Sequence, residues 1–189
     1  MPETAVTIGP VRFSYANVWK PVSVQGSEPK FSCSVLIPKT AENLIAACKN
    51  AINAAAEQGI ETNKFKRDLV DKGGLRIPIR DGDQEYDNGS RGPEYQGHWF
   101  INTSNQNQPG ILDKNKVAII DESEFYSGCH GYIHINFFPY NTAGNKGVGA
   151  SLQHLMKTLD DDRLDGRISA DEAFKSVEGP EEVTGGDLI

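Results

Sequence analysis

The chain has few cysteines and no long apolar segment. Only three cysteines occur in 189 residues, an odd and widely spaced set that predicts reduced thiols in a cytoplasmic protein. The longest apolar run is Leu44–Cys48, which is far too short to span a membrane. The first residues form neither a basic region nor an apolar region, so we expect no secretion signal. These absences exclude a disulfide-stabilised secreted domain and a protein with membrane-spanning helices.

Motifs that hold nucleotides, cofactors or structural metals are missing as well. The chain has no glycine-rich phosphate loop, no dinucleotide-binding turn and no nucleophile elbow. Cys129, His130, His134 and His154 do not match the ligand spacing of a zinc finger or ribbon. We therefore predict no cofactor and no metal, and we expect a buried thiol beside partly exposed imidazoles.

Two acidic patterns leave alternatives. Asp81, Asp83 and Glu85 have the carboxylate chemistry of a Mg²⁺-dependent nuclease, although Asp-Gly-Asp is also ordinary turn chemistry. Residues 161–172 match several positions of a calcium-binding EF-hand loop, but Arg163 stands where a ligand oxygen belongs. Neither pattern is complete. We therefore predict that the protein is not an enzyme, and we keep the nuclease as an alternative.

The C-terminal end of the chain is strongly acidic. Residues 160–189 contain ten acidic and three basic side chains, and this difference equals the whole net charge of −7. The preceding 159 residues hold sixteen of each sign and are balanced. Blocks of like charge stay solvated and commonly act as interaction arms. We therefore predict a neutral domain over residues 1–159 and a flexible acidic tail over residues 160–189, with a short helix near Ser169–Phe174.

Alternating apolar residues predict several short strands. In the clearest case, Ile133, Ile135 and Phe137 alternate with polar and aromatic residues between Tyr132 and Tyr140. Seven segments are expected as strands: 11–15, 31–37, 75–79, 98–103, 117–120, 132–140 and 148–155. Many short strands joined by polar, glycine-rich loops, including a long one at 80–93, are typical of a small β-barrel. The predicted fold is therefore mainly β, a β-barrel.

One helix is expected between the strands. An apolar stripe with helical spacing runs from Leu44 to Ala55, which predicts a helix from Ala41 to Gln58. Thr40 is expected as its N-cap and Gly59 as its C-terminal stop. The predicted architecture is thus a barrel with one inserted helix and an acidic tail.

Aromatic and basic residues are interleaved on the predicted strands. Single-stranded nucleic acid is held by this combination, because cations follow the phosphates while bases stack on exposed rings, each stack contributing about 1–3 kcal/mol. The alternative is that the rings simply fill the barrel. The expected phosphate-binding residues are Arg12, Lys20, Lys30, Arg76, Arg80 and Lys146. The expected stacking residues are Tyr15, Trp19, Tyr126, Tyr132, Phe138 and Tyr140.

Several segments, in their order and spacing, resemble those of one protein family. They are Val11–Tyr15 with Trp19 and Pro21, Lys30–Lys39, Arg80–Asp83, Phe125–Cys129, Ile135–Phe138 and Asn145–Val148. Between Val11 and Leu164 the chain resembles the single-stranded DNA-binding proteins of tailed-phage replication. The resemblance implies an OB-fold barrel that protects single strands in DNA replication or recombination. It also implies a C-terminal tail that modulates DNA binding.

The resulting hypothesis is a sequence-independent single-stranded DNA-binding protein of a phage, acting in the cytoplasm of the host cell. The acidic tail is expected to compete with DNA for the groove and to recruit replication proteins. Two alternatives stay open: the nuclease that uses Asp81, Asp83 and Glu85, and an adaptor whose tail binds a basic protein. The sequence leaves both a monomer and a dimer open.

Overall fold

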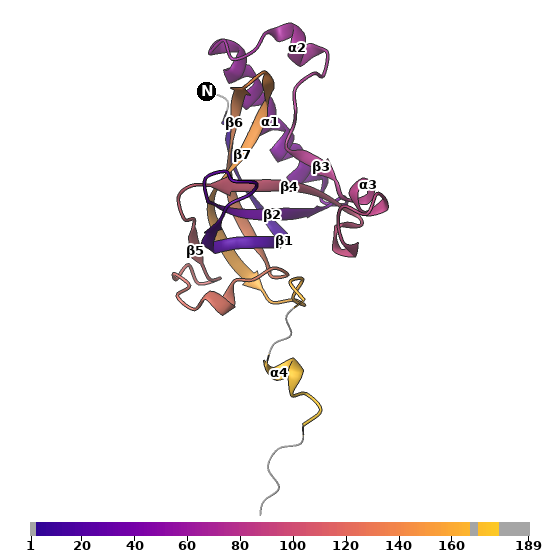
Figure 1. Ribbon diagram of the computed structural model, residues 1–189, viewed down its shortest axis with the longest axis vertical. Helices are drawn as coiled ribbons and strands as arrows, with labels where there is room; N and C mark the ends of the chain where they lie inside the picture. Colours follow the sequence, from indigo (N-terminus) through magenta and orange to yellow (C-terminus); the bar gives the residue numbers. More distant parts are fainter. Residues whose placement is uncertain (1–2, 167–169, 178–189) are drawn as a thin grey trace, which may run out of the picture.

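The computed structural model describes residues 3–166 and 170–177. Within them, seven strands form one sheet (Figure 1). The strands are β1 Ala5–Val22, β2 Lys30–Pro38, β3 Ile79–Asp81, β4 His98–Asn105, β5 Gly110–Leu112, β6 His130–Thr142 and β7 Asn145–Leu159. The helices are α1 Glu42–Glu61, α2 Arg67–Asp71, α3 Gly82–Asp87 and α4 Ala170–Ala173, with 3₁₀ turns η1 Pro93–Tyr95 and η2 Glu122–Glu124.

Five of the strands close into a barrel. The sheet order is β3-β4-β2-β1-β6-β7-β5, and an additional parallel pairing joins β4 to β7 at Ser104 and Ser151. The long β1 makes closure feasible, because its first half pairs with β6 and its second half pairs with β2. The prediction of a mainly β protein with a small OB-fold-like barrel is confirmed.

The barrel core follows the alternation of the strands. Ile133, Ile135 and Phe137 of β6 are almost fully buried, whereas the residues between them are half-buried or exposed on the opposite side. Helix α1 packs against β1, β6 and β7 and adds Cys48 and Ile52 to the same core. The helix predicted over 41–58 is therefore confirmed, and its apolar stripe faces the barrel.

A second, smaller apolar cluster lies outside the main core. Val35 and Ile37 of β2 belong to the main core, so Leu36 between them points to the other face of the strand. There Leu36 packs with Tyr95 and Phe100, and all three are fully buried. The cluster fixes the segment from α3 to η1 against the outside of β2 and β4.

The ends of α1 differ from the prediction. Ala41, not Thr40, occupies the N-cap, and no side chain caps the helix there. Gly59 lies inside the helix, which continues to Glu61. The ring of Phe65 packs directly on Gly59, where any side chain would collide with it. Gly59 therefore serves close packing, and its expected role as a helix stop was wrong.

Two predicted strands are absent from the described sheet. In segment 75–79 only Arg76 forms a bridge, to Gly147, and β3 begins at Ile79. Segment 117–120 has a single bridge at Ala118, and Ile120 is 91% exposed. A short apolar run in a sequence is not sufficient to tell a strand from an extended loop. For this reason the strands predicted at 75–79 and 117–120 were wrong.

The loop expected at 80–93 contains α3 and the start of η1. The Asp81 side chain accepts a hydrogen bond from the Asp83 backbone, so the Asp-Gly-Asp sequence caps a helix.

In the tail, α4 lies within the expected helix, but its expected cap Ser169 falls outside the described residues. None of the helices described is long and apolar enough to cross a membrane.

Candidate nucleic-acid interface

An aromatic cleft opens where the second half of β1 meets the segment that follows η2. It has a volume of about 670 Å³, and Tyr15, Trp19 and Tyr126 line it together with Phe125. Its charged lining residues are Arg163, Glu94, Glu122 and Asp165, so the cleft offers rings for bases and the phosphates need cations outside it. The Trp19 indole donates a hydrogen bond to the Phe125 carbonyl at 3.0 Å, which fixes its orientation. The structure thus brings together three of the six predicted stacking residues, and we name this site the aromatic cleft.

Tyr15 is the most exposed aromatic residue of the cleft. Its side chain is 54% exposed, and its backbone has a φ of +47°, in the left-handed region. The pairing of β1 with β2 is irregular between Ser14 and Asn17, so Tyr15 lies in a β-bulge. Bulges re-aim side chains and are common next to functional sites. The bulge turns this ring out of the barrel toward the cleft.

Arg91 covers the Tyr15 ring, and the sequence prediction of the site missed it. Its guanidinium carbon lies 5.1 Å from the centroid of the Tyr15 ring. Arg91 stands alone in a polar loop between Ser90 and Gly92, so no periodic pattern marks it. Its only sequence signal is a positive charge in a glycine-rich loop, which many solvated arginines share.

A second group of predicted residues lies on the β6–β7 hairpin, away from the aromatic cleft. The rings of Phe138 and Tyr140 lie 6.5 Å apart on its outer face. They pack on Gly149 and Gly147 of β7, their direct partners in the ladder. The backbone of Arg76 bonds to Lys146 and Val148, which places Arg76 beside the hairpin. We name Phe138, Tyr140, Arg76 and Lys146 the hairpin group.

The aromatic cleft and the hairpin group lie toward opposite ends of the β6–β7 ribbon. The hairpin tip is at residues 142–145, whereas Tyr126 lies beside Asp160, where the chain leaves β7 (Figure 1). Tyr132, the remaining predicted ring, is half-buried between them and packs on Gly9. The structure therefore divides the predicted site into two surfaces, one toward each end of the β6–β7 ribbon.

The predicted cations differ in what they already bind. Lys20 and Lys30 are exposed near the ends of β1 and β2, and no ion pair is recorded for either within the described residues. Arg80 pairs with Glu85 and also lies 5.3 Å from the centre of the Phe100 ring. Arg12 donates to the carbonyl of Gly128 at 3.0 Å. Lys20 and Lys30 are thus more available to phosphates than Arg12 or Arg80.

The start of the acidic tail contacts two of the predicted DNA-binding residues. The Tyr126 hydroxyl donates to Asp160 at 2.7 Å, and the Arg163 guanidinium lies 4.7 Å from the centre of the Tyr126 ring. Arg12 donates to the Asp162 carbonyl at 2.9 Å. Burial and the hydrogen bond to Asp160 raise the pKa of Tyr126 to about 12. Segment 160–163 therefore covers Tyr126 and occupies Arg12.

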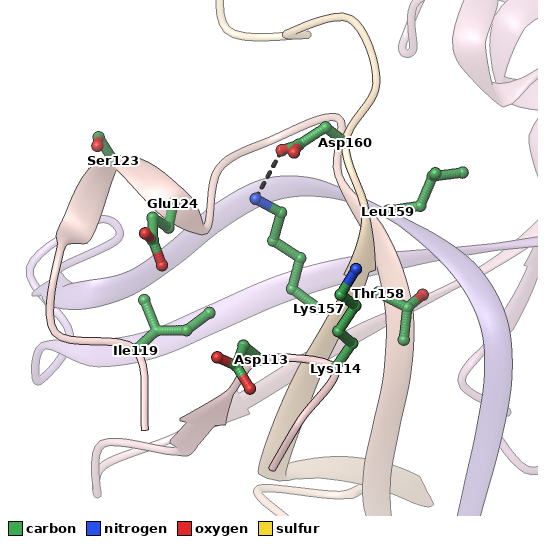
Figure 2. Close-up of a pocket in the computed structure, with 9 residues that line it drawn as sticks. All are labelled: Asp113, Lys114, Ile119, Ser123, Glu124, Lys157, Thr158, Leu159 and Asp160. Atoms are coloured by element: carbon green, nitrogen blue, oxygen red, sulfur yellow. Dashed lines mark ion pairs between the residues drawn. The ribbon is translucent and has the colours of Figure 1, made fainter. Parts of the chain in front are cut away.

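A mixed-charge pocket lies beside this contact (Figure 2). It has a volume of about 410 Å³, and its lining includes Asp113, Glu124 and Lys157. Figure 2 shows the Lys157 ammonium turned toward Asp160, and their ion pair measures 2.6 Å. The hydrogen bond from Lys157 lowers the pKa of Asp160. Because its charges are paired or of both signs, this pocket offers no cationic surface for phosphates.

Asp161 also binds the barrel, and this contact should depend on pH. His130 Nε2 lies 2.7 Å from its carboxylate, and this hydrogen bond lowers the pKa of Asp161. A carboxyl group with a depressed pKa stabilises the contact above its unfolded pKa of about 3.9 and loses that effect as the pH falls through the folded value. We expect an NMR titration of the Asp161 carboxyl carbon to give a midpoint below that of an unfolded peptide. A midpoint at or above the peptide value would contradict the contact.

The carboxylates of the nuclease alternative are already engaged. Lys39 Nζ lies 2.7 Å from both Asp81 and Asp83, and these hydrogen bonds lower the pKa of both carboxyl groups. Glu85 pairs with Arg80 and lies 3.9 Å from Arg91. In the described part of the chain, no group of three or more His, Cys, Asp or Glu is arranged to hold a metal ion. The nuclease alternative is not supported.

The other metal-like patterns include residues that already have contacts or are buried. The EF-hand-like stretch 161–172 includes residues outside the described ones, and its first position, Asp161, is bound to His130. Cys129 is buried, and burial raises the pKa of its thiol to about 11. The thiols of Cys33 and Cys48 are also free and buried. The prediction of a buried thiol at Cys129 is confirmed, and the reduced state of the three thiols stays a prediction.

Comparison with solved structures places this fold among phage proteins. The single-stranded DNA-binding protein from bacteriophage Enc34 in complex with ssDNA is 24% identical, with a TM-score of 0.67 over 85% of this chain and 89% of that chain. Its C-terminal truncation is 25% identical, with a TM-score of 0.67 over 85% and 88%. The protein gp2.5 of bacteriophage T7, a single-stranded DNA-binding protein, is 15% identical, with a TM-score of 0.51 over 98% of both chains.

Sequence comparison gives the family directly. A search of curated proteins found no match. In contrast, the family described as Enterobacter phage Enc34, ssDNA-binding protein, matches residues 4–184, which includes the barrel and most of the acidic end. By this match, the chain belongs to the family of the single-stranded DNA-binding protein of Enterobacter phage Enc34.

Proposed function

We propose that the protein binds single-stranded DNA without sequence preference during phage replication, inside the host cell, and that it is not an enzyme. The observation that carries the proposal is the aromatic cleft, where Tyr15, Trp19 and Tyr126 face one space of about 670 Å³. Exposed rings accept any base, and the exposed cations Lys20 and Lys30, near the ends of β1 and β2, are available to neutralise phosphates. Membership in a family of single-stranded DNA-binding proteins supports the same function.

Within this proposal, the aromatic cleft is the primary contact and the hairpin group extends it. The cleft holds the most exposed tyrosine, and its rings belong to two separate stretches of chain, β1 and the segment that follows η2. The hairpin group adds Phe138, which is 41% exposed, and the cations Arg76 and Lys146. A strand bound to both surfaces would follow the outer face of β6, where Tyr132 lies between them.

The acidic tail has two roles in the proposal. Segment 160–163 occupies Arg12 and Tyr126, so it competes with DNA for them. Once displaced by DNA, residues 160–189 form an acidic arm for replication or recombination proteins with basic surfaces. The division into a DNA-binding domain over residues 1–159 and a tail over residues 160–189 follows these roles.

The test is fluorescence anisotropy of labelled oligo(dT), with a duplex of equal length as the control. We expect preference for the single strand, with affinity falling as salt rises, because each neutralised phosphate contributes a slope of about −0.7 in a plot of log K against log salt. Oligonucleotide recovered after incubation with Mg²⁺ should be intact. Absence of binding by both the full chain and a chain ending at Leu159 would reject the proposed function. Cleavage of the oligonucleotide would support the nuclease alternative instead.

A further inference from the structure

Arg91 stands among three aromatic rings rather than in solvent. Its guanidinium carbon lies 5.1 Å from the ring centre of Tyr15, 5.4 Å from that of Tyr95 and 5.2 Å from that of Phe100. The side chain is only 21% exposed. Within the described part of the chain, its ion pair joins Nε to the Glu85 carboxylate at 3.9 Å. Most of the guanidinium surface therefore faces rings, which favours cation–π contact.

The rings below Arg91 form a rigid base. Tyr95 and Phe100 meet edge to face, with centres 5.0 Å apart and an interplanar angle of 89°. Both are fully buried, and the Tyr95 hydroxyl donates to Ser34 Oγ at 3.1 Å. Buried aromatic pairs of this geometry are well ordered, because packing and the hydrogen bond both fix the rings.

The chain segment that carries Arg91 is anchored at both ends. Before it, Lys39 holds Asp81 and Asp83 at 2.7 Å. After it, the Gly97 backbone donates to Asp83 at 2.9 Å. The backbone of Arg91 itself donates to the Glu85 carbonyl at 3.1 Å. Asp81 and Asp83, which the nuclease alternative assigned to a metal ion, therefore fix the position of Arg91.

Tyr15 receives Arg91 on part of its ring and leaves the rest open. Its side chain is 54% exposed in spite of the contact with Arg91. Its ring centre lies 6.5 Å from that of Tyr95, so the buried cluster supports Tyr15 as well. An exposed ring in a β-bulge has several rotamers available, and contact with a fixed guanidinium reduces that freedom.

We propose that Arg91 is a positioning residue that holds Tyr15 as a stacking surface for one DNA base. The inference rests on the proposed function and deepens it. Arg91 acts through Tyr15 and not through a phosphate, because Glu85 is within reach of its charge and three ring centres lie within 5.4 Å of its guanidinium carbon. Arg91 therefore contributes to DNA affinity through the stacking of a base on Tyr15, and it contributes nothing through phosphate contacts.

A double-mutant cycle with Tyr15→Ala and Arg91→Ala tests the coupling, read by anisotropy with oligo(dT). Tyr15→Ala should weaken binding about tenfold, the loss of one stacked base. Arg91→Ala should weaken it about fivefold in the intact chain, yet by less than about twofold once Tyr15 is alanine. Additive effects of the two substitutions would overturn the proposal, while leaving single-stranded DNA binding by the unaltered protein as a separate result.

A second ligand separates positioning from general damage to the fold. An oligonucleotide of equal length whose sugars carry no bases keeps every phosphate but offers nothing to stack. Arg91→Ala should leave its affinity unchanged, and the salt dependence of oligo(dT) binding should also stay the same. Equal weakening on both ligands, or a smaller salt slope, would overturn the proposal. If Arg91→Ala lowers the unfolding midpoint, the same two measurements are made on Arg91→Gln, which keeps the side-chain stem. We expect the same results: unchanged affinity for the base-free oligonucleotide and an unchanged salt dependence.

Arg80→Ala is the matched comparison for Arg91→Ala. Arg80 shares the Glu85 carboxylate and covers the Phe100 ring, but it has no recorded contact with Tyr15. Its effect on affinity should be equal on normal and base-free oligonucleotides, and additive with that of Tyr15→Ala. Coupling of Arg80 to Tyr15 as strong as that of Arg91 would show that loss of any arginine here disturbs the cluster, and the specific role of Arg91 would fall.

Discussion

A chain that ends at Leu159 should bind oligo(dT) about tenfold more tightly than the full chain at low salt, a difference that corresponds to about 1.4 kcal/mol. The deletion removes a net charge of −7 from a protein whose remaining residues are balanced. It also frees Arg12 from Asp162 and uncovers the ring of Tyr126. The gain should shrink as salt rises, because salt screens exposed charges and weakens the competing tail. Anisotropy titrations of both chains at two salt concentrations measure it.

A shorter deletion distinguishes occupied residues from general repulsion. Residues 167–189 carry six acidic and two basic side chains, a net charge of −4, but segment 160–166 keeps the contacts to Arg12, Tyr126 and His130. We expect deletion of residues 167–189 to give the smaller part of the gain. The remainder should appear when Asp160, Asp161 and Asp162 are also changed to asparagine. Equal affinity of the full and shortest chains at low salt would reject competition by the tail.

The parts of the fold that the sequence predicts well are those set by local periodicity. On β6 the side chains alternate between faces because the pleat alternates, so Ile133 and Phe137 had to share a face. The apolar stripe of α1 follows the helical repeat in the same way. Closure of the barrel through the parallel contact of Ser104 with Ser151 depends on the whole chain path and has no local signal.

The site was harder to predict than the fold, because charge and aromaticity do not reveal what a side chain already contacts. Arg12 has the right chemistry for a phosphate, but residues 150 positions away return to bind it. Tyr15 was predicted from the interleaving of aromatic and basic residues on the predicted strands, whereas its support by Arg91 and Tyr95 arises only when three segments meet. Residue type thus identified candidates, and tertiary contacts decided which are available.

Neighbouring phenylalanines on β6 should separate stability from binding. Phe137 is fully buried in the barrel core, and Phe137→Ala should lower the free energy of unfolding by about 3–5 kcal/mol, because the lost ring leaves a cavity. Phe138 points the other way, is 41% exposed and packs on Gly149. Phe138→Ala should cost less than about 1 kcal/mol, since little buried surface is lost. Urea unfolding followed by circular dichroism measures both values.

Oligo(dT) binding by the same pair then decides whether the hairpin group contacts DNA. Under conditions where both variants are folded, Phe137→Ala should keep the affinity of the unaltered chain, because its ring never reaches the surface. Phe138→Ala should lose about fivefold, at the low end of the range for one stacked base. Unchanged affinity of Phe138→Ala would confine stacking to the aromatic cleft. In that case the hairpin rings serve only to cover Gly147 and Gly149, and the DNA path along the outer face of β6 would have to be abandoned.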